Sequence, residues 1–384
     1  MRRLAVPLLA LLAALVPATA ARAEYVIDGR GFGHGVGMSQ YGAYGYALRE
    51  GRDHRWILGH YYPGTSVGRV ASARIRVVLR DTRAPKVCGA TSVRDATGRR
   101  VRLRDTRVYA FTALGAEKLR VRDTRSGRTR ARLRAPVRVT GGASVCIRGT
   151  AINDVRNGSY RGGLRLHRDD GRSVLAVNEL RLESYLRGVV AAEMPTSWAP
   201  EALKAQAVVA RSYALRSRRD DRVFDVYPDV RSQVYRGIAG EDAAATAAVR
   251  GTRALAVRYG VGIAQTFFHS TSGGRTAGNE EGFGGGLPIP YLRPVDDRHD
   301  DISPVHTWSV RLTDAQMARR LREVRLGDLE DVKVSETTGT GRVATVDVVG
   351  EDGTAPVSGL ELRRLLDLRS HWFTIRRVPD RPTR

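Results

Sequence analysis

The sequence has little lysine, little cysteine and few aromatic residues. Its 384 residues include 64 lysines and arginines, but lysine occurs at four positions only, and aromatic residues make up 7%. The two cysteines exclude a disulfide-dense scaffold and a zinc site built from cysteine alone. The formal net charge of +24 is therefore carried almost wholly by arginine. It fits an anionic partner such as nucleic acid, a membrane surface or a wall polymer, or an arginine bias with no partner.

Long apolar runs are absent beyond the first residues. A basic start at 1–3, an apolar run at 4–16 and small residues before position 24 predict a secretory signal peptide over 1–23. The run is short for a membrane span, although an uncleaved anchor is the alternative. We therefore expect a secreted, cell-wall-associated protein that binds neither nucleic acid nor, after cleavage, a membrane. In an oxidising compartment Cys88 and Cys146 are expected to form a disulfide worth roughly 3–4 kcal/mol, two buried thiols being the alternative.

The patterning predicts an α+β fold. It should have a mixed, mostly antiparallel core that is a β-sheet or barrel-like, a few helices carrying the cleft, and a small β-rich domain. Helices are expected over 182–192, 243–253, 313–323 and 359–368, with another starting near Ser197, and an apolar strand over 262–269. The expected division is a signal peptide (1–23), a glycine-rich block (24–69), an arginine-rich β domain (70–150), a catalytic domain (151–310), a C-terminal α/β part of the core (311–378) and a tail (379–384).

Glu193 is the first candidate for chemistry. Pro195 disfavours helical geometry at Met194, so the helix over 182–192 should end near Glu193. A carboxylate there meets the negative end of the helix dipole and apolar neighbours, and both effects raise its pKa. A general acid at neutral pH requires a raised pKa. The alternative is a solvated glutamate without a role.

Two glycine-containing segments each hold a histidine. The block GFGHGVGMSQYGA at 31–43 surrounds His34 with alternating glycines, which let the backbone approach another element closely. The segment HSTSGG at 269–274 places His269 where an apolar strand meets hydroxyl groups. These segments leave open a hydrolase that uses Ser270 or Ser272 with His269 and an aspartate at 296 or 297, a zinc site at His34 and His269, and a purely structural role.

Together these residues resemble the SpoIID/LytB family. The resemblance rests on YLRGVVAAEMP at 185–195, EALKAQAVVARSYA at 201–214, HSTSGG at 269–274 and PYL at 290–292. It also rests on the block at 31–43 and on the closing stretch at 362–375. The match is strong over roughly 160–310. The family includes lytic transglycosylases that cut peptidoglycan glycan strands and proteins described as amidase enhancers.

The resemblance implies a role for individual residues. Glu193 of the Glu-Met-Pro motif would be the single catalytic acid and base, which cuts between N-acetylmuramic acid and N-acetylglucosamine and leaves 1,6-anhydro ends. The remaining motif positions would bind substrate, namely Lys204, Arg211, His269, Ser272, Tyr291, His34 and Gln40. No metal and no organic cofactor are expected. The implied partners are peptidoglycan glycan strands, an anionic wall polymer or a cell-wall amidase, and a non-catalytic enhancer is the alternative function.

The order of the motifs departs from the family. The glycine-rich block follows the closing stretch in the family, whereas here it opens the chain. A circular permutation would produce this order, and permutation is tolerated where chain ends lie close together. We therefore expect a strand at 372–376 to lie beside residues 25–28. Some relatives bind zinc through cysteines near the cleft, but both cysteines here lie in the upstream β segment, so no such zinc site is expected.

Overall fold

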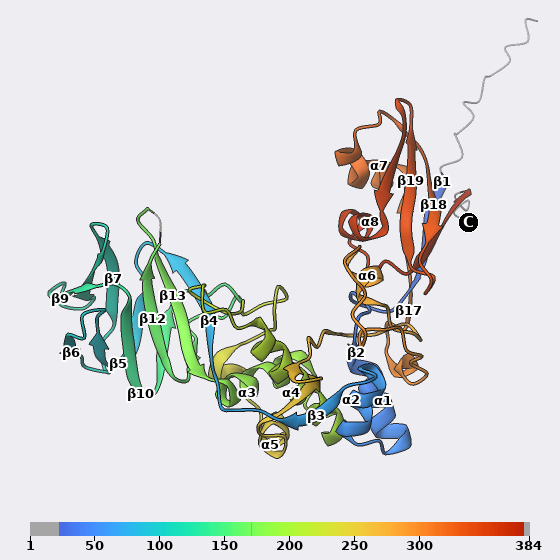
Figure 1. Ribbon diagram of the computed structural model, residues 1–384. Helices are drawn as coiled ribbons and strands as arrows, with labels where there is room; N and C mark the ends of the chain where they lie inside the picture. Colours follow the sequence, from blue (N-terminus) through green and yellow to red (C-terminus); the bar gives the residue numbers. More distant parts are fainter. Residues whose placement is uncertain (1–22, 170, 380–384) are drawn as a thin grey trace, which may run out of the picture.

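The computed structural model describes residues 23–169 and 171–379. The expected signal peptide up to residue 22 and the tail from residue 380 lie outside the described residues. Figure 1 shows a large sheet, a central group of helices and a smaller β part that carries the C-terminal strands. Helices combine with mostly antiparallel strands, which confirms the α+β class. No helix in the described part is long and apolar enough to cross a membrane.

The strands form separate open sheets and no closed barrel within the described residues, so the core takes the sheet form of the expectation and not the barrel-like one. The largest sheet has ten strands and continues past residue 150 to Arg181. Its alternating sequence places aliphatic side chains on the buried face and arginines in water. The strand order is β4-β13-β12-β10-β5-β7-β8-β9, with β11 beside β10 and β6 beside β5. The bounds are β4 (Arg74–Thr82), β5 (Lys86–Arg94), β6 (Arg100–Arg102), β7 (Tyr109–Leu114), β8 (Lys118–Asp123), β9 (Thr129–Arg134), β10 (Val137–Arg148), β11 (Ser159–Tyr160), β12 (Gly163–Arg168) and β13 (Val174–Arg181).

A disulfide joins the centre of this sheet. Cys88 on β5 lies directly opposite Cys146 on β10, and the two sulfur atoms are bonded, as expected. The bond closes a segment with a sequence separation of 58. Because it restricts the unfolded chain, it stabilises this sheet.

Helices α3 (Leu182–Glu193), α4 (Pro200–Ser217) and α5 (Ala243–Gly251) form the centre of the molecule. Helix α3 ends where Pro195 predicts, since Met194 is already extended. The small side chains of α4 are buried, so α3 and α5 can pack closely against it. A three-stranded sheet of β3 (Ser66–Arg69), β14 (Leu255–Tyr259) and β15 (Gly262–Ile263) covers α4.

The predicted strand over 262–269 is interrupted. Its two ends have different partners: β15 pairs with β14, whereas β16 (Phe268–His269) runs parallel to β2 (Met38–Ser39). The residues between them pass from one sheet to the other, so no continuous strand forms. As a result His269 lies beside the glycine-rich block.

The glycine-rich block continues into two helices that the sequence patterning did not indicate. Ser39 caps α1 (Gln40–Glu50) through a hydrogen bond from the Gly42 amide, and α2 (His54–Tyr61) follows. The preceding glycines are needed for close approach. Gly33 has a φ of +120°, and a Cβ there would lie 2.7 Å from the His269 Cβ.

The first and last described strands lie side by side. In the third part of the molecule β1 (Ala23–Arg30) pairs with both β17 (Thr307–Thr313) and β21 (Phe373–Pro379), and Ile27 lies opposite Ile375. The expected adjacency of residues 25–28 to the strand at 372–376 is therefore confirmed. Tyr25 and Ile27 complete a second apolar core with the C-terminal segment. The other elements here are β18 (Leu329–Thr337), β19 (Val343–Gly350), β20 (Gly353–Ser358), α6 (Asn279–Gly282), α7 (Asp314–Leu321) and α8 (Gly359–Leu366).

Candidate active site

Glu193 is the last residue of α3, and its side chain is partly buried. One carboxyl oxygen, Oε1, accepts a hydrogen bond of 2.6 Å from the Val234 amide. Burial raises the pKa of Glu193 to about 7, although the bond from Val234 favours the charged form. The helix dipole acts in the same direction as burial, because the carboxyl lies at the negative end of α3. Glu193 can therefore hold a proton near neutral pH.

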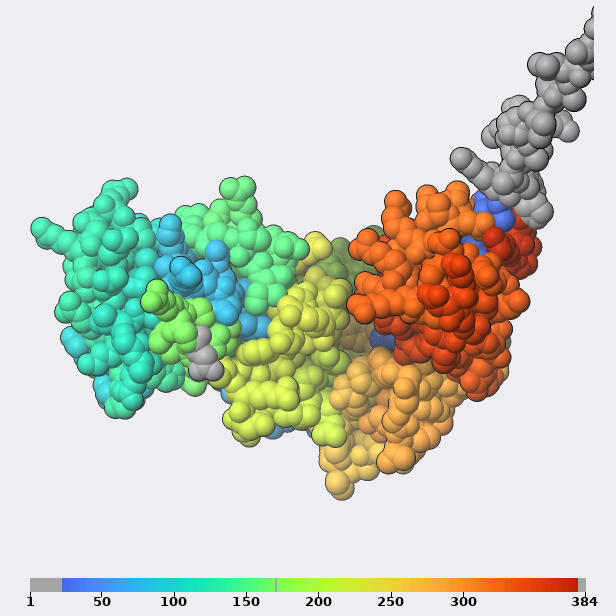
Figure 2. Space-filling model, turned by 90° about the horizontal axis from the view of Figure 1, so that it is seen from above, coloured from blue at the N-terminus to red at the C-terminus, as the bar shows by residue number. Residues whose placement is uncertain are grey.

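A groove of about 390 Å³ opens in front of this carboxyl. Its walls come from the end of α3, the loop at 230–234, strand β16, the glycine-rich block and helix α8. In Figure 2 the surface is hollowed between the yellow segment, which holds that loop, and the orange-red C-terminal part. Among the described residues that line the groove, Glu193 is the only carboxyl group. Any acid–base chemistry by carboxyl groups in this groove therefore falls to one side chain.

The structure brings His34 and His269 together in the same groove. Their ring centroids are 5.4 Å apart, and both rings bind the backbone of Val36. Nδ1 of His34 accepts from the Val36 amide at 3.0 Å, whereas Nδ1 of His269 donates to the Val36 carbonyl at 3.2 Å. Burial lowers the pKa of His34 to about 4 and that of His269 well below its usual value.

Val36 therefore fixes opposite tautomers in two neutral rings. His34 keeps its proton on Nε2 and can donate from that atom, whereas Nε2 of His269 can only accept. Within the described structure, Nε2 of His269 has no hydrogen-bond partner. The two rings therefore line the groove as neutral polar groups held in fixed orientations.

The groove is also lined by two arginines, which the sequence patterning did not single out. Arg231 pairs with Asp229 at 2.6 Å, and its guanidinium lies 3.9 Å from the centre of the Tyr227 ring. Arg363 on α8 is half-buried and donates from Nε to the Leu368 carbonyl at 3.3 Å. The only available signal for Arg363 was its place in the closing stretch of the family resemblance.

Aromatic side chains supply the apolar part of the groove. Phe267 and Phe283 meet edge to face with ring centroids 4.7 Å apart, and Phe283 lies 5.0 Å from the ring of His34. Phe283 comes from a short glycine-rich loop after α6, where nothing in the sequence pattern marked it as a site residue.

Arg211 lies outside the groove, contrary to the expectation that it binds substrate. It is fully buried and makes two hydrogen bonds of 2.9 Å to the Glu183 carboxylate, from Nε and Nη2. Nη1 also donates to the Leu255 carbonyl at 2.9 Å. Its guanidinium therefore joins α3, α4 and β14, and it is not free for a ligand.

The side chain of Lys204 also lies outside the groove. Its Nζ lies 2.5 Å from the Glu201 carboxylate, and the same carboxylate accepts from the His54 amide at 2.9 Å. Lys204 thus helps to hold the start of α2 against α4. The shared helix face of Lys204 and Arg211 does not form a binding surface.

Three further expected binding residues have structural partners. Ser272 donates to the buried carboxylate of Asp300 at 2.8 Å, and the Tyr291 hydroxyl accepts from the Gln265 amide at 2.9 Å. Gln40 is buried behind the catalytic candidate, where its Nε2 donates to the main-chain oxygen of Glu193 at 3.0 Å. None of the three lines the groove, and Gln40 alone among them contacts Glu193.

The geometry does not support a serine hydrolase. Ser270 bonds to Thr271, Ser272 bonds to Asp300, and Nδ1 of His269 is occupied by Val36. Asp297 is fully buried against the Tyr61 hydroxyl at 2.8 Å, and Asp296 is exposed. No serine is hydrogen-bonded to His269 among the described residues, so the relay that activates a serine nucleophile is missing.

Part of the chain is similar to a known protein family and to named proteins. Residues 170–259, which include Glu193, match the SpoIID family model, described as stage II sporulation protein. Stage II sporulation protein D of Bacillus subtilis is 31% identical over 222 residues, covering 53% of this chain and 63% of that protein. The amidase enhancer of Bacillus subtilis is 32% identical over 133 residues, covering 34% of this chain and 17% of that protein.

An uncharacterized protein of Brachyspira hyodysenteriae is 29% identical over 216 residues, covering 54% of this chain and 57% of that protein. The chain thus spans about three fifths of the length of the first curated relatives it matches. No solved structure matches it. The matched range contains the Glu193 motif, and the family model and the named relatives agree with the SpoIID/LytB resemblance, so the segment 170–259 is that of a SpoIID domain.

Proposed function

We propose that this protein is a secreted lytic transglycosylase that cuts the glycan strands of peptidoglycan. The observation that carries the proposal is a single groove carboxyl, Glu193, whose pKa is raised to about 7. Hydrolysing glycosidases use two carboxyl groups on opposite sides of the scissile bond. A transglycosylase that uses an internal hydroxyl as nucleophile needs one group, which donates a proton and then accepts one.

The proposed cycle has two steps on the same side chain. Protonated Glu193 donates its proton to the glycosidic oxygen between N-acetylmuramic acid and N-acetylglucosamine as the bond from that oxygen to C1 breaks. The carboxylate then accepts the proton of the muramyl C6 hydroxyl while that oxygen bonds to C1. The product carries a 1,6-anhydro ring, no water is consumed, and Glu193 is protonated again for the next cycle.

The other groove residues would bind and orient the sugars. The neutral rings of His34 and His269 would form a polar, uncharged wall beside the sugars. Phe283 supplies an apolar surface beside them. Arg363 places positive charge at the groove, which suits the carboxylates of muramyl residues, whereas the charge of Arg231 is already paired with Asp229.

The test is product analysis with purified protein and isolated glycan strands. The wild-type protein should produce 1,6-anhydro ends, identified by mass. Glu193→Gln should reduce the rate by about 10²–10⁴-fold and leave the far-UV circular dichroism and melting temperature in the folded range. Glu117→Gln, at an exposed carboxylate in the large sheet, is the matched control. Full activity of Glu193→Gln would contradict the proposal, and reducing ends would indicate hydrolysis.

A binding role without cleavage is the second candidate, and it is supported by the relative named amidase enhancer. In that case neither wild-type protein nor Glu193→Gln would release products from glycan strands. Both would instead increase the rate at which a purified cell-wall amidase releases peptides from intact peptidoglycan. The two assays on the same pair of proteins separate the two functions.

The arginine-rich sheet supports a further contact with the wall. On the exposed face of β8 and β9, Lys118 lies directly opposite Arg134, and Arg120 opposite Arg132. Like charges directly opposite on a sheet are destabilising. A cavity of about 440 Å³ near this face is lined by Arg83, Arg168 and Arg172. We propose that this surface binds an anionic wall polymer, which would offset the repulsion.

A further inference from the structure

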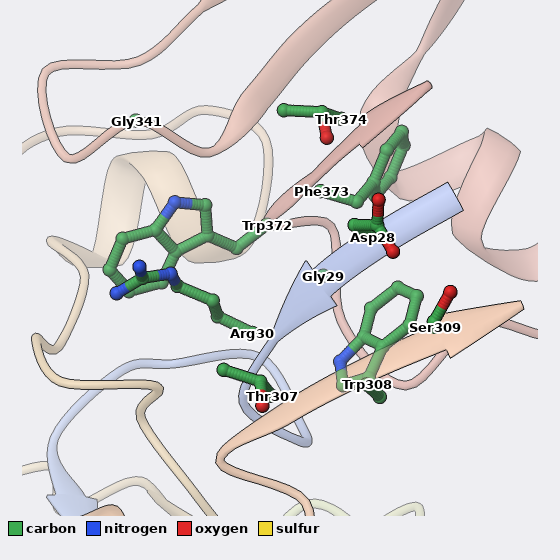
Figure 3. Close-up of a pocket in the computed structure, with 10 residues that line it drawn as sticks. All are labelled: Asp28, Gly29, Arg30, Thr307, Trp308, Ser309, Gly341, Trp372, Phe373 and Thr374. Atoms are coloured by element: carbon green, nitrogen blue, oxygen red, sulfur yellow. The ribbon is translucent and has the colours of Figure 1, made fainter. Parts of the chain in front are cut away.

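A second cavity lies in the part of the molecule that contains the first and last described strands, β1 and β21. It has a volume of about 580 Å³ and lies over the three-stranded sheet of β17, β1 and β21 (Figure 3). Two tryptophans, Trp308 on β17 and Trp372 just before β21, contribute their indole rings to its wall. Neither residue belongs to the groove at Glu193, and neither is used in the reaction proposed above.

Both rings are held in place by the surrounding structure. The Trp308 indole donates from Nε1 to the Gly31 carbonyl at 2.8 Å and lies over Gly29. A Cβ at Gly29 would come within 2.1 Å of that ring, so glycine is required there. The guanidinium carbons of Arg30 and of buried Arg342 lie 5.7 Å and 4.7 Å from the centre of the Trp372 ring. Rigid aromatic rings bind a ligand with little loss of side-chain entropy.

Hydrogen-bonding side chains surround the two indoles. Thr307 and Thr374 are exposed at the cavity, and Arg30 extends a guanidinium along the Trp372 ring. The Asp28 carboxylate also lines the cavity, where it pairs with Arg376 at 2.7 Å. Sugars present apolar C–H faces that stack on aromatic rings and hydroxyl groups that bond to such polar neighbours. An apolar wall with a few placed polar groups is typical of small-molecule sites.

The cavity is connected to the groove at Glu193 by a short piece of chain. Arg30 lines the cavity and His34 lines the groove. Arg30 and His34 are four positions apart in the chain, so the distance between their Cα atoms is at most about 14 Å. Phe32 between them is exposed, and the Arg369 guanidinium carbon lies 5.6 Å from the centre of its ring. One extended polymer can therefore contact both sites.

We infer that the Trp308–Trp372 cavity is a distal subsite for a glycan strand, and that it holds sugar units a few residues away from the bond at Glu193. This inference rests on the proposed function for the identity of the polymer. It predicts that the protein favours long strands, because only a long strand reaches both sites. Arg30 adds a positive charge for the muramyl carboxylate of a unit bound there.

Binding can be measured without cleavage in the Glu193→Gln protein. The probes are β-1,4-linked N-acetylglucosamine oligomers from dimer to hexamer and purified glycan strands, titrated by calorimetry. Trp308→Leu and Trp372→Leu, each added to Glu193→Gln, should weaken binding of the hexamer and the strands about tenfold or more. The dimer is too short to reach both sites, so its affinity should change less than that of the hexamer. Trp56→Leu, the same change on α2, should alter neither.

Because Trp308 packs on the sheet, its replacement can prevent folding, so a second set of variants tests the cavity without changing the tryptophans. Arg30→Ala with Thr374→Ala changes two exposed side chains at the cavity and should give the same loss for long probes, with the melting temperature unchanged. Unchanged affinity for hexamer and strands in these variants would overturn the subsite. Failure of the wild-type protein to cut strands, together with length-dependent binding lost in the cavity variants, would contradict the transglycosylase and leave the subsite standing.

Discussion

The side-chain amide of Gln40 donates a hydrogen bond of 3.0 Å to the main-chain oxygen of Glu193, across 153 positions of sequence. The last carbonyl groups of a helix have no partner within the helix, and Gln40 satisfies the one that belongs to the catalytic candidate. The glycine-rich block therefore supports the end of α3 from behind, and its own histidine faces the groove.

Removal of this support should affect the reaction more than substrate binding. Gln40→Ala leaves the Glu193 carbonyl without its buried donor, which costs about 1–3 kcal/mol of stability. We expect kcat to fall about tenfold with KM nearly unchanged, because Gln40 positions the acid and does not touch the substrate. Steady-state kinetics on glycan strands at a temperature where both proteins are folded will test this. A rise in KM with kcat unchanged would instead place Gln40 in substrate binding.

The rate of cleavage should fall as the pH rises through about 7. Glu193 must begin the cycle protonated, and burial raises its pKa to about 7, so the protonated fraction falls above that pH. The buried histidines are already neutral there and add no further step. A pH profile of kcat/KM between 5 and 9 will show the descending limb. A rate that keeps rising to pH 9 would exclude Glu193 as the general acid.

The same pKa predicts how stability depends on pH. Glu193 binds its proton more tightly in the folded state than in the unfolded state, where its pKa is near 4.5. Between pH 4.5 and 7 the folded protein therefore holds more protons at this site, and this contribution to stability is lost as the pH rises. The free energy of unfolding of Glu193→Gln relative to the wild type should therefore increase between pH 4.5 and 7, by an amount on the order of 1–3 kcal/mol. Above pH 7 the difference should stay constant. Urea unfolding of both proteins at pH 5, 6, 7 and 8 measures the difference.

Arg211 should matter for folding and not for binding. Its guanidinium is fully buried against Glu183, and breaking a buried ion pair by removing one partner costs about 3–5 kcal/mol. Arg211→Met should lower the melting temperature strongly, and Arg211→Lys should not restore it, since lysine cannot make two parallel bonds to the carboxylate. Glycan affinity of the folded fraction should match the wild type. Weaker binding with unchanged stability would return Arg211 to the substrate site.

The arginine face of β8 and β9 should bind the wall through charge. Arg120→Gln with Arg132→Gln removes one opposed pair, so the protein should elute from isolated cell walls at lower salt, since salt screens exposed charges. The same change should slightly raise stability, by about 0.2–1 kcal/mol, because it relieves repulsion. Arg319→Gln with Arg322→Gln, near α7, removes equal charge elsewhere as a control. Equal elution of both double variants would show that net charge alone decides binding.

The local parts of the fold were predictable because they depend on neighbours in sequence. Pro195 fixed the end of α3, and alternating residues indicated the strands of the large sheet. The adjacency of residues 25–28 to the last strand is a long-range contact, and it was expected only because the order of the motifs differs from that in the family. Helices α1 and α2 were not predicted, because the many glycines before them hide the helical pattern. The prediction of one strand over 262–269 was wrong for another reason: the partners of its two ends lie in different sheets.

The sequence by itself determined the SpoIID/LytB resemblance, the candidate acid and the chemical reason for its raised pKa, since a helix end with apolar neighbours is a local property. Only the tertiary structure decided which charged and polar side chains remain free. Arg211 and Ser272 sit in motifs but have partners from distant segments, and Lys204 pairs with Glu201 on its own helix, which in turn binds His54 of α2. Arg363 and Phe283, in contrast, reach the groove from elements that fold against it. A side chain is available to a ligand only when no other part of the chain satisfies it, and that depends on packing across the whole molecule.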